Sequence, residues 1–317
     1  MRLLVSIVTP SYNQGAFLEA TITSVLDQDY EALEYILVDG KSTDGSVDII
    51  KKYSDRLAWW VSEKDQGQAD AINKGLSRVR GEIIGWLNSD DVYLPGALQT
   101  VATFFQDHPD VGLVFGDLLA VDENGEQINI LRYADYTLQD LMAFRIIGQP
   151  AVFFRKEVLK EAGFLDLSYH YLLDHQLWIR MASFTNIRHI PQVLAGARFH
   201  QGAKNVAAAE QFGEEAYRIV NWMRSYEKTS SILPGIEKKV LAGACLIDGR
   251  YLLDGGKPRQ AFKVYARSLF LHPATGFREF HRMLYALAAT LGLVRVQSVV
   301  ERRRKLNTIK ARFHRKQ

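Results

Sequence analysis

The chain has 317 residues, of which 47% are hydrophobic and 24% are charged, as in an ordinary globular protein. This length allows two domains, or one large domain with an appendage, and the net charge of +3 does not by itself indicate a nucleic-acid partner. The one cysteine, Cys245, excludes an internal disulfide and a zinc site built from cysteines. A lone cysteine also fits a reducing compartment, and the apolar helical sequence around Cys245 predicts that it is buried.

The N-terminal sequence MRLLVSIVTP lacks the apolar length and the cleavage site of a signal peptide, and it predicts a first strand. No segment approaches the ~20 apolar residues that cross a bilayer. The nearest candidate, residues 283–294, is too short.

Strand and helix patterns alternate through the first 120 residues. Buried apolar runs predict strands at 3–9, 33–39, 57–62 and 82–88, and helical spacing predicts helices at 15–28, 42–53 and 68–81. Repeated units of this kind predict an α/β fold with a mostly parallel sheet and helices on both faces. In such sheets, ligands bind beyond the carboxyl ends of the strands.

The pattern changes after residue 110. Two apolar runs within 111–133 predict a hairpin, 151–163 predicts strand–helix pieces, 173–182 predicts a helix and 188–200 a strand broken near Pro191. From about residue 207 the chain is mostly helical. We therefore expect an α/β domain over 1–205 and a helical region over 206–317, with one tetratricopeptide-like hairpin at about 241–273 and a basic tail at 302–317.

Acidic residues follow three of the predicted strands. Asp39 ends the second strand, Asp65 follows the third, and Asp90 and Asp91 follow the fourth. By the rule for strand ends they face one crevice, where a divalent cation would let carboxylates and phosphates lie together. One alternative is that Asp90 and Asp91 cap the helix that follows them. Asp39 could likewise be a turn residue, and Asp65 a solvated acid of a loop.

Asp174 lies in a predicted helix, on the same face as Trp178 and Met181. A partly buried carboxylate there could act as a general base, or it could pair with Arg180. His200 ends a predicted strand, where a lone histidine has either a structural role or a ligand role.

Five motifs occur in a fixed order: TPSYN at 9–13, VDGKSTDGS at 38–46, KDQGQADAINKGL at 64–76, LNSDD at 87–91 and LLDHQLWIRMA at 172–182. Each motif is weak alone, but the ordered set resembles glycosyltransferase family 2, whose members have the GT-A fold. The resemblance covers about residues 3–205. It implies a nucleoside-diphosphate sugar donor, a divalent metal that is Mn²⁺ or Mg²⁺, and a saccharide or lipid-linked acceptor.

For the donor, the resemblance implies that Thr9, Pro10 and Tyr12 line the base pocket and that Asp39 hydrogen-bonds the base. Asp65 would then lie near the nucleotide. The Asp-x-Asp element of the family aligns with Ser89-Asp90-Asp91, so a serine replaces its first acid here.

For the metal and the reaction, the resemblance assigns Asp90 to the ribose or to a metal-bound water and Asp91 to the metal itself. His200 would approach the metal or the diphosphate. Asp174 matches the catalytic base of the inverting members. These roles fit a single displacement, which needs one base and one metal site and no covalent nucleophile.

Two other classes of function compete with this interpretation. A nucleotidyltransferase also places acids at strand ends, but TPSYNQGAF contains no Lys or Arg for phosphate binding. A non-catalytic scaffold that keeps only the fold would be expected to lose its acids, whereas Asp39, Asp91 and Asp174 are all present.

The tail 302–317 holds eight Lys or Arg residues and no acid, which leaves 31 basic against 36 acidic residues elsewhere. Such a tail is either a solvated basic end or a site of attraction to anionic lipid, since an apolar segment precedes it. Nucleic acid is disfavoured because no aromatic stacking platform accompanies the charge. We therefore expect a cytoplasmic protein that can lie at the membrane periphery, with cell-surface polysaccharide or glycoconjugate synthesis as its role.

Overall fold

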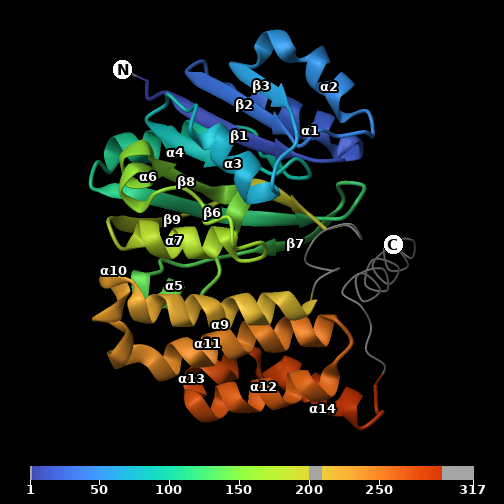
Figure 1. Cartoon of the computed structure of the whole chain (residues 1–317), viewed down its shortest axis with the longest axis vertical. Coiled ribbons are helices and arrows are strands. Elements are labelled where there is room, and N and C mark those ends of the chain that lie inside the picture. Colours follow the sequence, from blue (N-terminus) through green and yellow to red (C-terminus); the bar gives the residue numbers. More distant parts are fainter. Residues whose placement is uncertain (1, 200–208, 295–317) are drawn as a thin grey trace, which may run out of the picture. The chain divides into compact units, whose positions relative to one another are not determined.

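The computed structural model describes residues 2–199 and 209–294, which form two compact units. The first unit holds residues 2–141 and 146–199, and the second holds 142–145 and 209–294. Figure 1 shows the elements of each unit coloured along the chain.

The first unit contains a nine-stranded sheet in the order β3-β2-β1-β4-β8-β6-β9-β5, with β7 paired to β6. Its strands are β1 (Val5–Ser11), β2 (Leu33–Asp39), β3 (Trp59–Ser62), β4 (Ile83–Trp86), β5 (Val92–Tyr93), β6 (Val111–Val121), β7 (Gln127–Leu131), β8 (Val152–Arg155) and β9 (Asn186–Arg198). Its helices are α1 (Gly15–Leu26), α2 (Ser46–Lys52), α3 (Gln68–Leu76), α4 (Ala97–Asp107), α5 (Leu138–Met142), α6 (Lys156–Ala162) and α7 (Leu173–Ala182), with short 3₁₀ turns η1 (Ser54–Arg56) and η2 (Gln149–Ala151).

The first four strands are parallel to their neighbours, as β1 pairs with both β2 and β4 and β2 pairs with β3. Beyond them, β8 runs antiparallel to both β4 and β6, and β9 runs parallel to β6. The sheet is therefore mixed, and the predicted α/β class with flanking helices is confirmed. The strands β2 and β3 lie on one side of β1, and the chain then crosses to form β4 on the other side, so the strand order reverses at β1. By the rule for such sheets, a ligand crevice is expected beside the carboxyl ends of β1 and β4.

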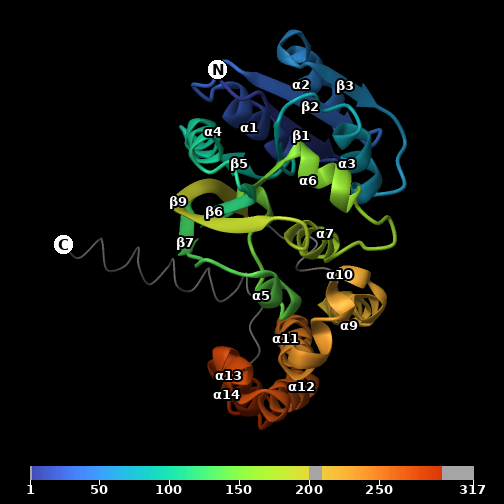
Figure 2. The same cartoon turned by 90° about the vertical axis from the view of Figure 1, so that its left-hand side faces the viewer.

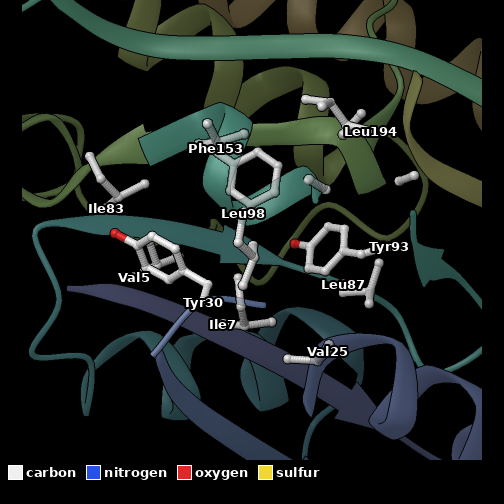
Figure 3. Packing of buried hydrophobic residues seen from close by; sticks show 14 of the residues in the cluster. Val5, Ile7, Val25, Tyr30, Ile83, Leu87, Tyr93, Leu98, Phe153 and Leu194 are labelled. Carbon is white, nitrogen blue, oxygen red and sulfur yellow. The ribbon is translucent and has the colours of Figure 1, made fainter. Parts of the chain in front are cut away.

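Helices cover both faces of the sheet. Figure 2 shows α1 and α4 on one side of the strands and α3, α6 and α7 on the other. On the first side, Ile7 of β1 and Phe153 of β8 share one apolar cluster with Ile22 of α1 and Leu98 of α4. Figure 3 shows part of this cluster, in which the ring of Tyr93 stacks on that of Phe153 at 5.3 Å between centroids.

The second face holds α3 and α7 close to the strands. A Cβ at Gly75 of α3 would lie 2.3 Å from Cγ1 of Val8, so this glycine permits the close approach of the helix to β1. On α7, the ring of Trp178 packs 6.0 Å from that of Trp86 and 5.7 Å from that of Phe154. These contacts hold the middle of α7 against the end of β4.

The predicted hairpin is β6 and β7, and the broken strand is β9. The pairing of β9 with β6 shifts register near Gly116 and Asp117, opposite the segment that contains Pro191. Proline cannot donate to a ladder of backbone hydrogen bonds, which accounts for the irregularity.

The second unit is a stack of helices. They are α9 (Ala209–Ser225), α10 (Glu227–Ser230), α11 (Leu233–Asp254), α12 (Pro258–Leu271), α13 (Pro273–Gly276) and α14 (Phe280–Thr290), with the 3₁₀ turn η3 (Phe277–Glu279). The helical hairpin predicted at about 241–273 corresponds to the second part of α11 and to α12, with Gly255 and Gly256 between them. The two helices pack closely, since Ser268 Oγ donates to the Ala242 carbonyl at 2.8 Å, and Cys245 is buried in α11 as predicted. The tail 302–317 lies outside the described residues.

No helix within 2–199 or 209–294 combines the length and the apolar character that crossing a membrane requires.

Candidate active site

Asp39 is fully buried at the end of β2, and a network of serines fixes its carboxylate. Oδ1 accepts from Ser42 Oγ at 2.5 Å, while Oδ2 accepts from the Ser42 N–H at 2.9 Å and from Ser62 Oγ at 2.6 Å. Ser42 lies in the loop after β2, and Ser62 ends β3. The carboxylate is therefore held in one orientation at the edge where three parallel strands end. Asp39 also stabilises the turn after β2, through its bonds to Ser42.

Tyr12, Gly40 and Asp65 converge beside Asp39. A Cβ at Gly40 would lie 2.4 Å from Asp65 Oδ2 and 3.2 Å from Cδ2 of Tyr12. The Tyr12 side chain is 62% exposed, so its ring forms an open wall rather than part of the core. Asp65 accepts the Gly67 N–H at 2.9 Å, at the start of α3. Together these groups make an aromatic and acidic rim around the end of β2.

Thr9 and Pro10 are buried within β1, in register with Leu37 and Val38 of β2. Thr9 Oγ1 accepts from the Tyr35 hydroxyl at 3.1 Å, which ties it to the core beneath the rim. At the end of the same strand, Ser11 Oγ is buried and has no hydrogen-bond partner within the described residues. A buried hydroxyl in that state favours a ligand that supplies the missing partner.

The loop after β4 carries Asp90 and Asp91. The helix that follows begins at Ala97 with Gly96 as its N-cap, so the alternative that the two acids cap this helix is wrong. Asp91 Oδ1 instead accepts the Arg198 N–H at 2.9 Å, and the Asp91 carbonyl accepts from Thr21 Oγ1 at 2.7 Å. The acids are therefore anchored between α1 and the end of β9.

Asp91 is buried, whereas Asp90 is half-buried. Burial, followed by the neighbouring charge of Asp90, raises the pKa of the Asp91 carboxyl well above its usual value. Hydrogen bonds from Arg198 and Asn88 act in the opposite direction. A bound cation would relieve the same penalty by stabilising the carboxylate.

A network of side-chain amides lies next to the loop that carries Asp90 and Asp91. Asn88 Oδ1 accepts from Gln68 Nε2 at 2.9 Å and from the indole N–H of Trp86 at 2.8 Å. Asn88 Nδ2 donates to Gln149 Oε1 at 2.9 Å, and Gln149 Nε2 donates to the Trp86 carbonyl at 2.5 Å. The network joins the first residue of α3, the end of β4 and η2.

Asp174 is half-buried in the first turn of α7, and its Oδ1 accepts the His175 N–H at 2.7 Å. Trp178, one turn later, packs on Trp86 of β4. The guanidinium of Arg180 donates to the carbonyls of Ala162 and Phe164. Asp174 thus lies one turn before the residue of α7 that packs on the end of β4.

The donor set fits a divalent cation, with two adjacent carboxylates in a partly desolvated loop. Within the described residues, no group of three or more His, Cys, Asp or Glu side chains forms a complete metal cage. Mg²⁺ and Mn²⁺ bound with a nucleotide commonly take only one or two protein carboxylates, with phosphate and water as the other ligands. His200 lies outside the described residues.

Two parts of this arrangement are not evident from the sequence pattern. Asn88 lies within the LNSDD motif, but Gln149 lies in none of the five motifs, and their hydrogen bond joins positions 61 residues apart. Arg198 shows no local signal, because its bond to Asp91 spans 107 residues. A basic residue at the end of the strand just before His200 is the one feature that could have pointed to it.

Comparisons with known proteins identify the family and the fold. The model of glycosyl transferase family 2 matches residues 6–163. A "PGL/p-HBAD biosynthesis glycosyltransferase" of Mycobacterium bovis is 30% identical over 214 residues, which cover 65% of this chain and 81% of that protein.

Two solved structures share the fold. S. aureus TarS 1–349 in complex with UDP-GlcNAc has a TM-score of 0.60 at 16% identity, covering 89% of this chain and 92% of that one. The mannosyltransferase PcManGT from Pyrobaculum calidifontis, in complex with GDP-Man and Mn²⁺, has a TM-score of 0.61 at 19% identity, covering 98% of this chain and 85% of that one. The fold is therefore of the GT-A type, and the chain belongs to glycosyl transferase family 2.

Proposed function

We propose that this glycosyltransferase is a metal-dependent inverting enzyme that moves a sugar from a nucleoside-diphosphate donor to an acceptor hydroxyl. The observation that carries the proposal is the set of acids at the carboxyl ends of neighbouring strands: Asp39 ends β2, Asp65 follows β3, and Asp90 and Asp91 follow β4. The solved relatives bound to UDP-GlcNAc and to GDP-Man with Mn²⁺ support a nucleotide-sugar donor and a divalent metal.

In this proposal, the nucleoside lies against the Asp39 end of the crevice. The Asp39 carboxylate, oriented by Ser42 and Ser62, accepts a hydrogen bond from the base. The exposed Tyr12 ring offers a face for stacking, above Thr9 and Pro10 in β1. Asp65 bounds the same space beside Gly40, where any larger side chain would close it.

Asp91 would hold the metal, with Asp90 directed to the ribose or to a metal-bound water and His200 as a further ligand. When bound, Mn²⁺ or Mg²⁺ neutralises the charge that develops on the departing diphosphate. The chain contributes anchoring before any ligand arrives, since Thr21 donates to the Asp91 carbonyl and the Arg198 N–H donates to the Asp91 carboxylate.

Asp174 is the proposed base. Its carboxylate takes the proton of the acceptor hydroxyl while the acceptor oxygen forms its bond to the anomeric carbon, and the bond from that carbon to the diphosphate breaks. The nucleoside diphosphate leaves on the opposite face, so the anomeric configuration inverts. No covalent intermediate with the chain is needed.

The test is the substitution Asp174→Asn, which keeps the size of the side chain and removes its basicity. We expect transfer to fall by at least about 10²-fold, since a positioned general base contributes about 10²–10⁴-fold, while the Kd for the nucleotide stays within about two-fold. A screen of common nucleotide sugars that follows release of the nucleoside diphosphate identifies the donor and supplies the assay. Near-normal turnover in Asp174→Asn would show that this base assignment is wrong.

We also propose that the acceptor is a saccharide or a lipid-linked saccharide and that the protein works at the cytoplasmic face of a membrane, in cell-surface polysaccharide or glycoconjugate synthesis. Support comes from exposed apolar side chains of the second unit, which precede the basic tail in the sequence. They are Phe270, Phe277, Leu284, Leu291, Leu293 and Val294.

A further inference from the structure

Arg198, the last residue of β9, joins the acidic loop to a distant turn. Its backbone N–H donates to Asp91 Oδ1 at 2.9 Å, and its side-chain Nε donates to the Asp90 carbonyl at 3.0 Å. Its Nη1 donates to the carbonyls of Asp122 and Glu123, at 3.2 and 3.1 Å, in the turn between β6 and β7. One side chain therefore bridges two loops that are about thirty residues apart in the sequence.

The surroundings of Arg198 restrict its conformation. The guanidinium lies over the ring of Phe17 in α1, with its central carbon 4.9 Å from the ring centroid. The backbone on either side of its carbonyl is held in the sheet, because Arg198 pairs with Val121 of β6 and the Phe199 N–H donates to the Val121 carbonyl at 2.9 Å. A planar, multidentate donor fixed in this way sets the distance between the loops.

The pattern of these bonds matters for a cation at Asp90 and Asp91. These three guanidinium bonds go to backbone carbonyl oxygens, so the side chain positions the loop, while only the backbone N–H of Arg198 donates to a carboxylate oxygen, Asp91 Oδ1. Carboxylates that bind metals are commonly held by such outer partners, whose removal weakens metal binding about 10–100-fold.

We propose that Arg198 is a positioning residue for the donor metal, and that through it the β6–β7 turn controls how strongly Asp91 binds that metal. This inference rests on the proposed function, since it takes Asp91 as the metal ligand. It adds a role for Arg198 and for a turn that itself carries no proposed ligand.

The chain offers a matched control in Arg155. Its guanidinium also donates to backbone carbonyls, those of Val111 and Phe105 at 2.8 and 2.7 Å, and also lies 4.9 Å from a phenylalanine ring, that of Phe105. Arg155 pairs with Ile83 at the start of β4, whereas the acidic loop follows the end of β4. It thus has the same structural role at the opposite edge of the sheet.

The experiment measures the Kd of Mn²⁺ by calorimetry on full-length protein saturated with UDP, or with GDP where wild type prefers it, together with the thermal midpoint of each variant. Arg198→Gln should raise the Kd about ten-fold or more, and Arg198→Lys should recover part of that loss. Arg155→Gln should lower the thermal midpoint by a similar amount and leave the Kd within about two-fold of wild type.

A further variant, Asp122→Ala, tests whether the β6–β7 turn affects metal binding through Arg198. Asp122 Oδ1 accepts the N–H groups of Asn124 and Glu126 at 2.9 and 3.0 Å, so Asp122→Ala loosens the turn without touching the acids. We expect a several-fold rise in the Mn²⁺ Kd with Arg198 present, a smaller rise in the Arg198→Lys background and no further rise in the Arg198→Gln background, because both changes then act through one shared set of contacts.

The outcomes separate the two proposals. Wild type that binds Mn²⁺ with a nucleotide, while Arg198→Gln binds it equally well, overturns the role of Arg198 alone. An equal loss in Arg155→Gln overturns it as well, because the effect would then be a general loss of stability. Wild type without any metal-dependent nucleotide binding overturns the proposed function and this inference together. Should Arg198→Gln fail to fold, the Arg198→Lys and Asp122→Ala variants carry the same comparison.

Discussion

Asp174 and His175 are neighbours in the first turn of α7 but occupy different surroundings. Asp174 is half-buried, whereas His175 is buried and its Nε2 lies 2.9 Å from the Leu141 carbonyl. Burial lowers the pKa of His175 to about 4, and the hydrogen bond to Leu141 opposes that change. The histidine therefore stays neutral in the folded protein at neutral pH, and it orients the helix turn that carries the proposed base.

The lowered pKa of His175 predicts a pH dependence of stability. Because the folded pKa lies below the unfolded value of about 6.5, the unfolded chain takes up the proton first. The contribution to stability is full above pH 6.5 and is lost as the pH falls toward 4, by up to about 1.4 kcal/mol per pH unit. Urea unfolding between pH 7 and pH 4.5 measures it, with His175→Gln as the control that cannot titrate. An identical loss of stability in wild type and His175→Gln would contradict the prediction.

At this scale the sequence predicts that acids gather, but not how each one is held. Two adjacent aspartates after a strand, Asp90 and Asp91, indicate a ligand site. The sequence does not show that Asp91 is held by Thr21 and Arg198, because these residues belong to other elements. The orientation of Asp39 likewise depends on Ser62 at the end of another strand. Contacts between residues far apart in the chain leave no local pattern.

At the scale of elements, α3 packs on β1 through a glycine. A Cβ at Gly75 would lie 2.3 Å from Val8 Cγ1 and 3.4 Å from Val38 Cγ2. The helical spacing of QADAINKGL predicts the helix, but the reason for a glycine in its last turn is visible only when the strand beneath is known. The first residue of α3, Gln68, also donates to Asn88 below the acidic loop, so the seating of α3 affects the site.

We predict that Gly75→Ala destabilises the protein by about 1–3 kcal/mol, since overpacking of a tight contact costs about that much. Gly235 in α11 is the matched control, because a Cβ there would meet nothing within 4 Å. Gly235→Ala should leave stability unchanged or raise it by about 0.4–1 kcal/mol. Denaturant midpoints measure both variants, and equal effects of the two substitutions would contradict the proposed packing constraint.

The position and direction of the later strands in the sheet could not be predicted from the sequence. The run VFFR became β8, which lies between β4 and β6 and is antiparallel to both. Three apolar residues do not distinguish a strand from the start of the adjoining helix, and the direction of a strand is set by its partners. The alternating first half was predictable because each of its strands and helices repeats one unit.

At the scale of the whole molecule, the first unit carries the proposed chemistry and the second carries exposed apolar side chains. Phe270 is 89% exposed and Phe277 59% exposed. Gly276 packs against Leu269, so Phe270 and Phe277, which follow these two residues in the sequence, lie in the same part of the second unit. Exposed apolar side chains, followed at 302–317 by eight basic residues without an acid, suit an anionic lipid surface.

We predict that the full-length protein floats with vesicles that contain about 30% phosphatidylglycerol and that a 1–300 truncation floats much less, because each Lys or Arg near such a surface contributes about 1 kcal/mol. Raising the salt from 0.1 to 0.5 M should weaken flotation. Phosphatidylcholine vesicles serve as the neutral control. Equal flotation of both proteins would show that the basic tail does not contribute to membrane binding.

The central claim is that the carboxyl edge of the sheet binds a nucleoside diphosphate through a metal held by Asp91. Calorimetric titration of UDP, GDP and dTDP into the full-length protein, with and without Mn²⁺, tests this claim most directly, with Asp91→Asn as the paired variant. We predict that one of the nucleotides binds wild type in Mn²⁺, at least about ten-fold more weakly without the metal, and that the metal no longer strengthens binding in Asp91→Asn. Nucleotide binding that is equally strong without metal, or an undiminished metal effect in Asp91→Asn, would contradict it.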